Sequence, residues 1–257
     1  MKKLISFSLY GSHKKYLHGI IEAVVSYKLY FDDSWKIRVY ACESLKDHRV
    51  IAVLKNFNAE VVFRKQQGKI LEKRENNEGM FWRFEPLYDD SDIHCFISRD
   101  ADSRATAREY KMVNEFLESN EVLHVIHDHR CHSGVMGGMF GVRLTKLKEK
   151  KYNIPSCMDY VSKEIKENGC PRRGSDQTWL RNVMSPIIAE NGYLLHVCKG
   201  NLSGKKIDDI TLLGKHKIID GHYIVTEDAH NFIGRQHHIQ SPTDLKLRNQ
   251  VFLPIQF

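Results

Sequence analysis

Apolar and polar residues alternate along the first part of the chain in patterns that predict strands and helices in turn. An apolar run at residues 4–11 ends at a glycine, as a β-strand often does. Apolar residues then recur at helical spacing over 15–31. Further strand patterns lie at 35–41, 59–65, 92–98 and 121–128, and a further amphipathic helix pattern lies at 104–119. This alternation predicts an α/β fold in which helices flank a mixed, mainly parallel sheet.

The pattern becomes looser beyond about residue 145. Helices are expected at 158–168 and 175–188 and a short strand at 193–198, whereas the polar stretch 68–79 predicts a loop or an exposed helix. Residues 201–257 mix short strand patterns with polar turns. We therefore expect a main domain over 1–200 and a C-terminal extension over 201–257 that packs on it.

Composition is that of a soluble protein with an anionic partner or a lysine-rich surface. The 257 residues are 42% hydrophobic and 28% charged, which suits one large domain with a full core. The formal net charge is +7, and the pI is near 9.0. A nucleic acid, an acidic membrane surface and a phosphorylated small molecule all fit this bias, and so does an ordinary basic surface.

Cysteine usage and the N-terminus indicate a cytosol-like compartment. The six cysteines are scattered without a CxxC pair, which argues against a zinc ribbon or a disulfide framework. The short apolar run near the N-terminus is broken by Gly11 and Ser12, too early for a secretory leader. The chain contains no run of about 18 apolar residues, so no membrane span is expected. A cytoplasmic location is expected, in a bacterial or virus-infected cell.

Two aspartates follow directly on the strand predicted at 92–98. Asp100 and Asp102 would lie at the carboxyl ends of the strands, where open α/β sheets bind ligands. Two carboxylates in one turn can bind a hard divalent cation, and the arginines around them suit phosphate oxygens. The alternative is a surface turn with ion pairs and an Asp N-cap for the next helix.

Two later segments also carry candidate chemistry. Four histidines lie with Asp128 in a short stretch before the glycine pair Gly137–Gly138, but their spacing matches no common zinc motif. The glycines allow close backbone approach or form a simple turn. In SDQTWLRN (175–182), Ser175 is a candidate N-cap, and Trp179 and Leu180 are expected to face the core. Asp176 and Gln177 would then project toward the pocket, unless they only cap the helix.

Taken together, these segments resemble DxD-containing GT-A-type glycosyltransferases of viruses and bacteria. The resemblance covers roughly residues 3–200 and leaves 201–257 without a motif. The segments that carry it are ISFSLYGSHKKYLHG (5–19), WKIRVY (35–40), FWRFEPL (81–87), FISRDADSRATARE (96–109), HVIHDHRCHSGVMGGMFGVR (124–143) and SDQTWL (175–180). One departure concerns His127, which stands where the family usually has an arginine.

The resemblance implies a nucleoside-diphosphate sugar donor, UDP-linked by default, bound with Mn²⁺ or Mg²⁺. Asp102 would be the main metal ligand, Asp100 would share the metal or contact the ribose, and His196 would complete the metal site. The nucleoside would lie against the first strand, and its phosphates would be reached by basic side chains. The residues implied are Phe7, Ser8, Leu9 and Tyr10 for the nucleoside and Arg83, Arg99 and Lys199 for the nucleotide and its phosphates.

For the sugar, the resemblance implies contacts from Asp128, Gly137, Gly138, Asp176 and Gln177. The Asp176–Gln177 pair is similar to one beside the donor sugar in retaining galactosyltransferase-like enzymes, which slightly favours retention. In an inverting enzyme, a carboxylate would act as general base on the acceptor hydroxyl of a glycan.

Two other functions remain open from the sequence. A metal-dependent nucleotidyltransferase or phosphohydrolase also uses paired aspartates, although the Asp-Gln segment and the broad pattern weigh against it. A non-enzymatic nucleic-acid-binding protein would explain the basic pI, but the chain contains no recognisable nucleic-acid module, so no nucleic-acid partner is expected.

Overall fold

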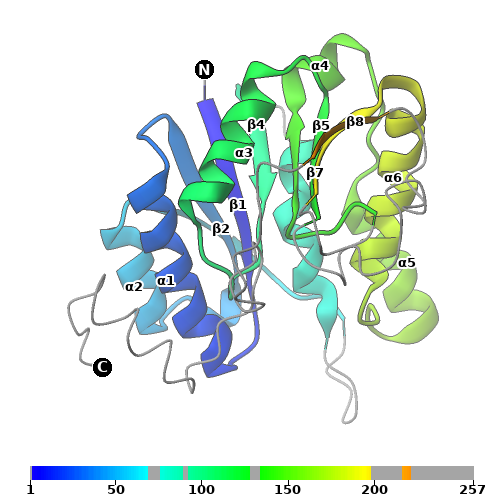
Figure 1. Ribbon diagram of the computed structural model, residues 1–257. Coiled ribbons are helices and arrows are strands. Elements are labelled where there is room, and N and C mark those ends of the chain that lie inside the picture. The colour runs from blue at the N-terminus through cyan, green and yellow to red at the C-terminus, as the bar shows by residue number, and fades with distance from the viewer. Residues whose placement is uncertain (1, 69–75, 89–91, 128–133, 198–215, 221–257) are drawn as a thin grey trace, which may run out of the picture.

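Strands of one central sheet place alternate side chains into two apolar cores, one on each face. The computed structural model describes residues 2–68, 76–88, 92–127, 134–197 and 216–220. Within β1 (Lys2–Leu9), Ile5, Phe7 and Leu9 pack under the helices of one face, whereas Leu4 belongs to the opposite core. The sheet is therefore covered by helices on both sides (Figure 1).

Eight strands in the described ranges form the sheet in the order β3-β2-β1-β4-β6-β5-β7-β8. Every neighbouring pair is parallel except those of β6, which runs antiparallel to both β4 and β5. The remaining strands are β2 (Trp35–Cys42), β3 (Glu60–Arg64), β4 (Ile93–Ser98), β5 (Leu123–His127), β6 (Phe140–Arg143), β7 (Tyr193–Val197) and β8 (His216–Asp220). The expected α/β fold with a mixed, mainly parallel sheet is confirmed.

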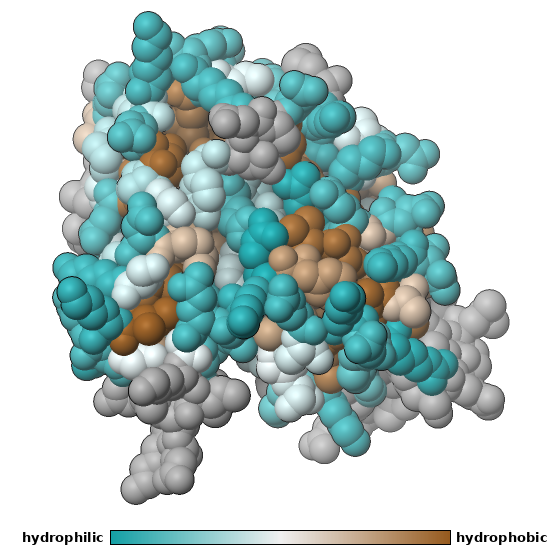
Figure 2. All heavy atoms as spheres, turned by 180° about the vertical axis from the view of Figure 1, so that it is seen from behind, coloured by the Kyte–Doolittle hydropathy of each residue, from teal (hydrophilic) through white to brown (hydrophobic). Residues whose placement is uncertain are grey.

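Helices divide between the two faces of the sheet. The first core receives side chains from α1, α2 and α3, and the second receives them from α5, α6 and the 3₁₀ segment η2. The bounds are α1 (Lys14–Tyr30), η1 (Glu43–Leu45), α2 (Arg49–Asn56), η2 (Asn77–Leu87), α3 (Ala107–Glu118), α4 (Leu144–Glu149), α5 (Cys157–Asn168) and α6 (Ser175–Asn191). Seen from behind, polar side chains cover most of the surface, with smaller apolar patches between them (Figure 2).

Several elements differ from the expectation. Helices α2 and α4 had no predicted counterpart, and neither had β6, which begins two residues after Gly138. The polar segment expected to be a loop or an exposed helix runs in part into η2, where Asn77, Glu78 and Gly79 are buried. Of the extension expected over 201–257, the described part is β8, which pairs with β7 at the edge of the sheet. No helix in the described ranges is long and apolar enough to cross a membrane.

A buried ion pair ties α3 to the sheet and corrects one sequence expectation. The Arg99 guanidinium donates from Nε to Glu109 Oε1 at 2.5 Å, and the Tyr27 hydroxyl donates to the same oxygen at 2.6 Å. Arg99 also donates to the carbonyl oxygens of Ser98 and Phe140. Its side chain is 1% exposed, so Arg99 is a core residue. The expected contact between Arg99 and a nucleotide phosphate is therefore wrong.

We expect Glu109→Gln to lower the free energy of unfolding by about 3–5 kcal/mol, because it leaves a buried guanidinium without a counter-charge. Urea unfolding followed by circular dichroism measures this loss. Glu118→Gln, at the exposed end of the same helix, serves as the control and should change stability by less than about 0.5 kcal/mol. Equal stabilities of the two variants would contradict the structural role given to Arg99.

Candidate functional site

Several candidate residues meet at the edge of the sheet where the parallel strands β1 and β4 end. Tyr10 and Asp100 follow these two neighbouring strands, and the pairing of Ser98 with Phe140 brings the start of β6 to the same edge. Gly137 and Gly138 lie just before that start, separated from it by Met139. The carboxyl edge of the sheet thus gathers residues that lie far apart in the sequence.

Arg83 is the centre of this cluster. It lies in η2, and its side chain is only 6% exposed. The guanidinium pairs through Nη1 with Asp100 and through Nη2 with Asp176, the latter at 3.2 Å. Burial disfavours its charge, but the two carboxylates outweigh that effect and raise the pKa of Arg83. One buried cation therefore joins the FWRFEPL, RDADSR and SDQ segments.

The backbone of Arg83 is held by two serines of β1. The Ser6 hydroxyl donates to the Arg83 carbonyl at 2.8 Å, and the Arg83 N–H donates to the Ser8 hydroxyl at 2.9 Å. Both serines are buried. Because β1 lies at the centre of the sheet, these bonds place Arg83 rigidly relative to Asp100.

Glycines at 137 and 138 are required by the side chains that pack against their backbone. A Cβ on Gly137 would clash with the Arg83 guanidinium, and a Cβ on Gly138 would clash with the Asp100 carboxylate. The Gly137 N–H also donates to Gln177 Oε1 at 3.2 Å, and its carbonyl accepts from the Ser98 hydroxyl at 2.6 Å. The backbone of both glycines lies close to these protein side chains, and the expected approach to a sugar stays a prediction.

Asp102 is buried and paired with a lysine that the sequence argument did not single out. The Lys15 Nζ lies 2.7 Å from Asp102 Oδ2, and the Asp102 side chain is 2% exposed. Burial raises the pKa of Asp102, Asp100 raises it further, and Lys15 opposes both. Helix α3 is capped by Thr106, whose side chain accepts from the Glu109 N–H, so neither aspartate is the N-cap of that helix.

At the start of α6, Asp176 is buried and Gln177 is half-buried. Burial raises the pKa of Asp176, and Arg83 opposes this shift. Its second oxygen, Oδ1, is buried without a hydrogen-bond partner among the described residues. Trp179 and Leu180 are buried, as expected. The expected cap is wrong, because Gly174 occupies the N-cap position and Ser175 is the first helical residue.

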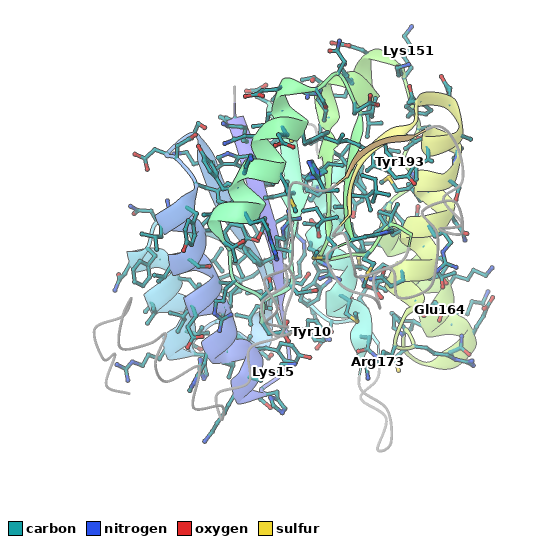
Figure 3. All side chains as sticks on the ribbon, in the orientation of Figure 1. Tyr10, Lys15, Lys151, Glu164, Arg173 and Tyr193 are labelled. Carbon is teal, nitrogen blue, oxygen red and sulfur yellow. The ribbon has the colours of Figure 1, made fainter. Side chains whose placement is uncertain are left out.

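Tyr10 is the residue of the first-strand group whose side chain faces this edge. In Figure 3, the labelled residues Tyr10, Lys15 and Arg173 all lie toward this end of the sheet. The Tyr10 ring meets Trp82 edge-on at 6.2 Å, and a Cβ on Gly79 would clash with it. Phe7 and Leu9 instead point into the core, so their side chains cannot hold a nucleoside as expected.

His196 is not placed to be a metal ligand. Its Nδ1 is hydrogen-bonded to His124 Nε2 at 2.8 Å and its Nε2 to Glu115 at 2.9 Å, so neither ring nitrogen has a free lone pair for a cation. It lies under α3, where the His124 ring stacks on Phe116. The sequence could not reveal this placement, because the pattern around a histidine in a strand is the same whether its side chain faces a site or a core.

The remaining candidates divide between described and undescribed residues. His127 is buried and bonded through Nε2 to the Gly134 carbonyl oxygen at 2.7 Å, and burial lowers its pKa. Asp128 and Lys199 lie outside the described residues. Among the described residues, no group of three or more His, Cys, Asp or Glu side chains could hold a metal ion.

Lys15 is the main site residue that the sequence did not reveal, although two lysines at a helix start were a usable signal.

Comparisons with known proteins give distant structural likeness. No protein-family model matches the chain, and no curated protein matches it. Mouse xyloside xylosyltransferase 1 is 11% identical, with a TM-score of 0.44 over 81% of this chain and 91% of that one. Residues 1–349 of Staphylococcus aureus TarS, solved with UDP-GlcNAc, are 13% identical, with a TM-score of 0.45 over 80% of this chain and 62% of that one.

A further structure of similar score is a 4-diphosphocytidyl-2C-methyl-D-erythritol synthase of Anaerococcus prevotii. It is 9% identical, with a TM-score of 0.44 over 97% of both chains. Glycosyltransferases thus recur among the similar structures, beside an enzyme of another kind. At these identities and scores, the likeness assigns no activity to this chain.

We expect Gly138→Ala to destabilise the protein by about 1–3 kcal/mol, because its Cβ overlaps the Asp100 carboxylate. Asp100→Ala removes the group that the new methyl would meet. The double variant should therefore be more stable than the sum of the two single losses predicts, by about 0.5 kcal/mol or more. A double-mutant cycle in urea measures this coupling, and strict additivity would contradict the packing described.

We also expect stability to fall as the pH is lowered from 7.5 to 5.5. Burial lowers the pKa values of His124 and His196, and Arg99 adds to the effect on His124. Below the unfolded value of about 6.5, the unfolded chain binds protons that the folded rings refuse, which favours unfolding. Each ring contributes up to about 1.4 kcal/mol per pH unit.

Urea midpoints across this pH range measure the slope, and His124→Phe keeps an aromatic ring against Phe116 while removing one of these titrating groups. The variant should lose stability less steeply than the natural protein as the pH falls. An identical slope would show that His124 does not contribute.

Proposed function

We propose that the chain is a metal-dependent glycosyltransferase that moves a sugar from a nucleoside-diphosphate sugar to a glycan hydroxyl. A UDP-sugar is the first donor to test, and retention of configuration is the favoured outcome. The proposal is supported most by the ion pairs of Arg83 with Asp100 and Asp176, which bring residues from three motif segments together at the carboxyl edge of the sheet.

A lone Asp-x-Asp turn would not need this arrangement. Here the first aspartate contacts the same guanidinium as the aspartate of the SDQ segment, and Gly138 packs against the first of them. Convergence of separate segments on one edge of an α/β sheet is typical of a ligand site. The ion pairs also connect the three motif segments with one another, which a simple surface turn would not require.

A divalent cation would bind at this edge through two carboxylates and the phosphate oxygens of the donor, since the described residues form no group of three metal ligands. Asp100, Asp102 and Asp176 supply three carboxylates, and Arg83 and Lys15 supply the cations paired with them. The Asp100 side chain is 39% exposed, so one hard-oxygen donor is accessible. Asp100 and Asp102 are the residues that would hold the metal. When bound, the metal would neutralise charge on the departing diphosphate.

Other residues of the cluster would orient the donor. Tyr10 offers an aromatic face at the edge for the nucleoside, and Asp176 with Gln177 would lie beside the sugar. Arg83 pairs with both Asp100 and Asp176 and fixes their positions relative to each other. Charge stabilisation in a transition state requires such preorganisation. Asp128 is proposed to contact the sugar, and Lys199 is proposed to contact the diphosphate.

A thermal-shift screen of nucleotide sugars with Mn²⁺ tests the function. A donor bound at about 100 times its Kd stabilises the folded state by about 2.7 kcal/mol, so the correct donor should raise Tm only when the metal is present. Turnover is then measured as release of the nucleoside diphosphate with a glycan acceptor. Consumption of nucleoside triphosphates without sugar transfer would support a nucleotidyltransferase or phosphohydrolase instead.

Asp102→Asn should lower metal-dependent turnover by at least about 100-fold while the protein stays folded, because it removes a ligand charge that would hold the metal. Asp92→Asn is the matched control, since the Asp92 side chain is 93% exposed and precedes β4 at the other end of that strand. Undiminished turnover in Asp102→Asn would refute the mechanism.

A further inference from the structure

The ion pair between Lys15 and Asp102 occupies the carboxylate on which the proposed metal site depends. Lys15 lies in the first turn of α1, and its side chain is 15% exposed. Its Nζ is 2.7 Å from Asp102 Oδ2 and 5.1 Å from the centre of the Tyr16 ring. The ammonium is thus partly withdrawn from water and lies at the edge of the site.

The position of this lysine runs against helix electrostatics. The first turn of a helix carries partial positive charge and favours acidic residues. In α1 this turn contains Lys14 and Lys15 and no acidic residue. Two cations at a helix start form an electropositive surface at the edge of the sheet, which would favour an anionic ligand there.

The same oxygen of Asp102 cannot serve an ammonium and a divalent cation at once. Two cations on one carboxylate oxygen would repel each other strongly in a buried site. A metal that binds Asp102 through Oδ2 therefore requires Lys15 to leave that oxygen. A buried ammonium that loses its counter-charge is costly, so it needs another anion within reach.

We propose that Lys15 exchanges partners during donor binding. It holds Asp102 in the free protein, gives up that carboxylate to the divalent cation, and then pairs with an oxygen of the donor diphosphate. Lysine suits such an exchange, because its charge is compact and its stem is flexible. This inference rests on the proposed function and adds to it a residue that couples metal binding to nucleotide binding.

The exchange has a measurable thermodynamic consequence. Without nucleotide, Lys15 competes with the metal for Asp102 and weakens metal binding. With nucleotide, the diphosphate accepts the displaced ammonium and the competition ends. Mn²⁺ and UDP should therefore each strengthen binding of the other, and by the same factor.

Isothermal titration of Mn²⁺ and UDP into purified protein tests this coupling. Lys15→Met should bind Mn²⁺ alone about tenfold more tightly than the natural protein and should bind UDP about tenfold less tightly when Mn²⁺ is saturating, because repulsion at Asp102 and a phosphate contact are both lost. Lys14→Met, an exposed lysine of the same turn, is the matched control and should behave like the natural protein.

Lys15→Gln is the second variant, because its amide can still hydrogen-bond Asp102 if Lys15→Met fails to fold. Unchanged Mn²⁺ affinity in a folded Lys15 variant overturns the inference and leaves the proposed function standing. Tighter Mn²⁺ binding with unchanged UDP affinity overturns the exchange to phosphate. Absence of Mn²⁺ binding in every protein, including the natural one, overturns the inference together with the proposed metal dependence.

Discussion

The structure of the site depends on one buried guanidinium. Arg83 is almost fully removed from water, and a cation in that position is tolerated only with carboxylates beside it. Asp100 comes from the turn after β4 and Asp176 from the start of α6, so the need to neutralise Arg83 holds two distant segments together. The two serines of β1 that bond its backbone extend this constraint to the centre of the sheet. Geometry that catalysis would need is thus set by an electrostatic requirement of folding.

The fold followed closely from the hydrophobic pattern, and its departures have physical causes. Long elements such as α1 and α3 could be predicted because their periodicity extends over many residues. Helix α2 is a single eight-residue element, and β6 has four residues within a glycine-rich stretch, so neither carries enough pattern to be recognised alone. What makes β6 a strand is its pairing with β4 and β5 on both sides, which is a tertiary effect that a single sequence does not display.

The site shows which kind of inference a sequence permits. Motif segments drew attention to Arg83, Asp100 and Asp176, and the structure joins these three residues through ion pairs. Arg99 and His196 were misplaced because a pattern identifies the strand but not which face a polar residue meets. Arg99 directly precedes Asp100, yet its side chain turns back under α3. Lys15 escaped notice because its importance lies in a contact with Asp102, which is far away in the sequence.

The antiparallel strand β6 restricts how this protein can change over evolutionary time. Phe140 is paired with Ser98 on one side and with Val125 on the other, so its register is fixed twice. A shift of one residue would turn every side chain of the strand to the opposite face. The positions of Gly137 and Gly138 depend on this register, because only Met139 separates them from the strand. Insertions and deletions between these glycines and Phe140 should therefore be excluded from related sequences, while changes of length are tolerated only farther from the strand.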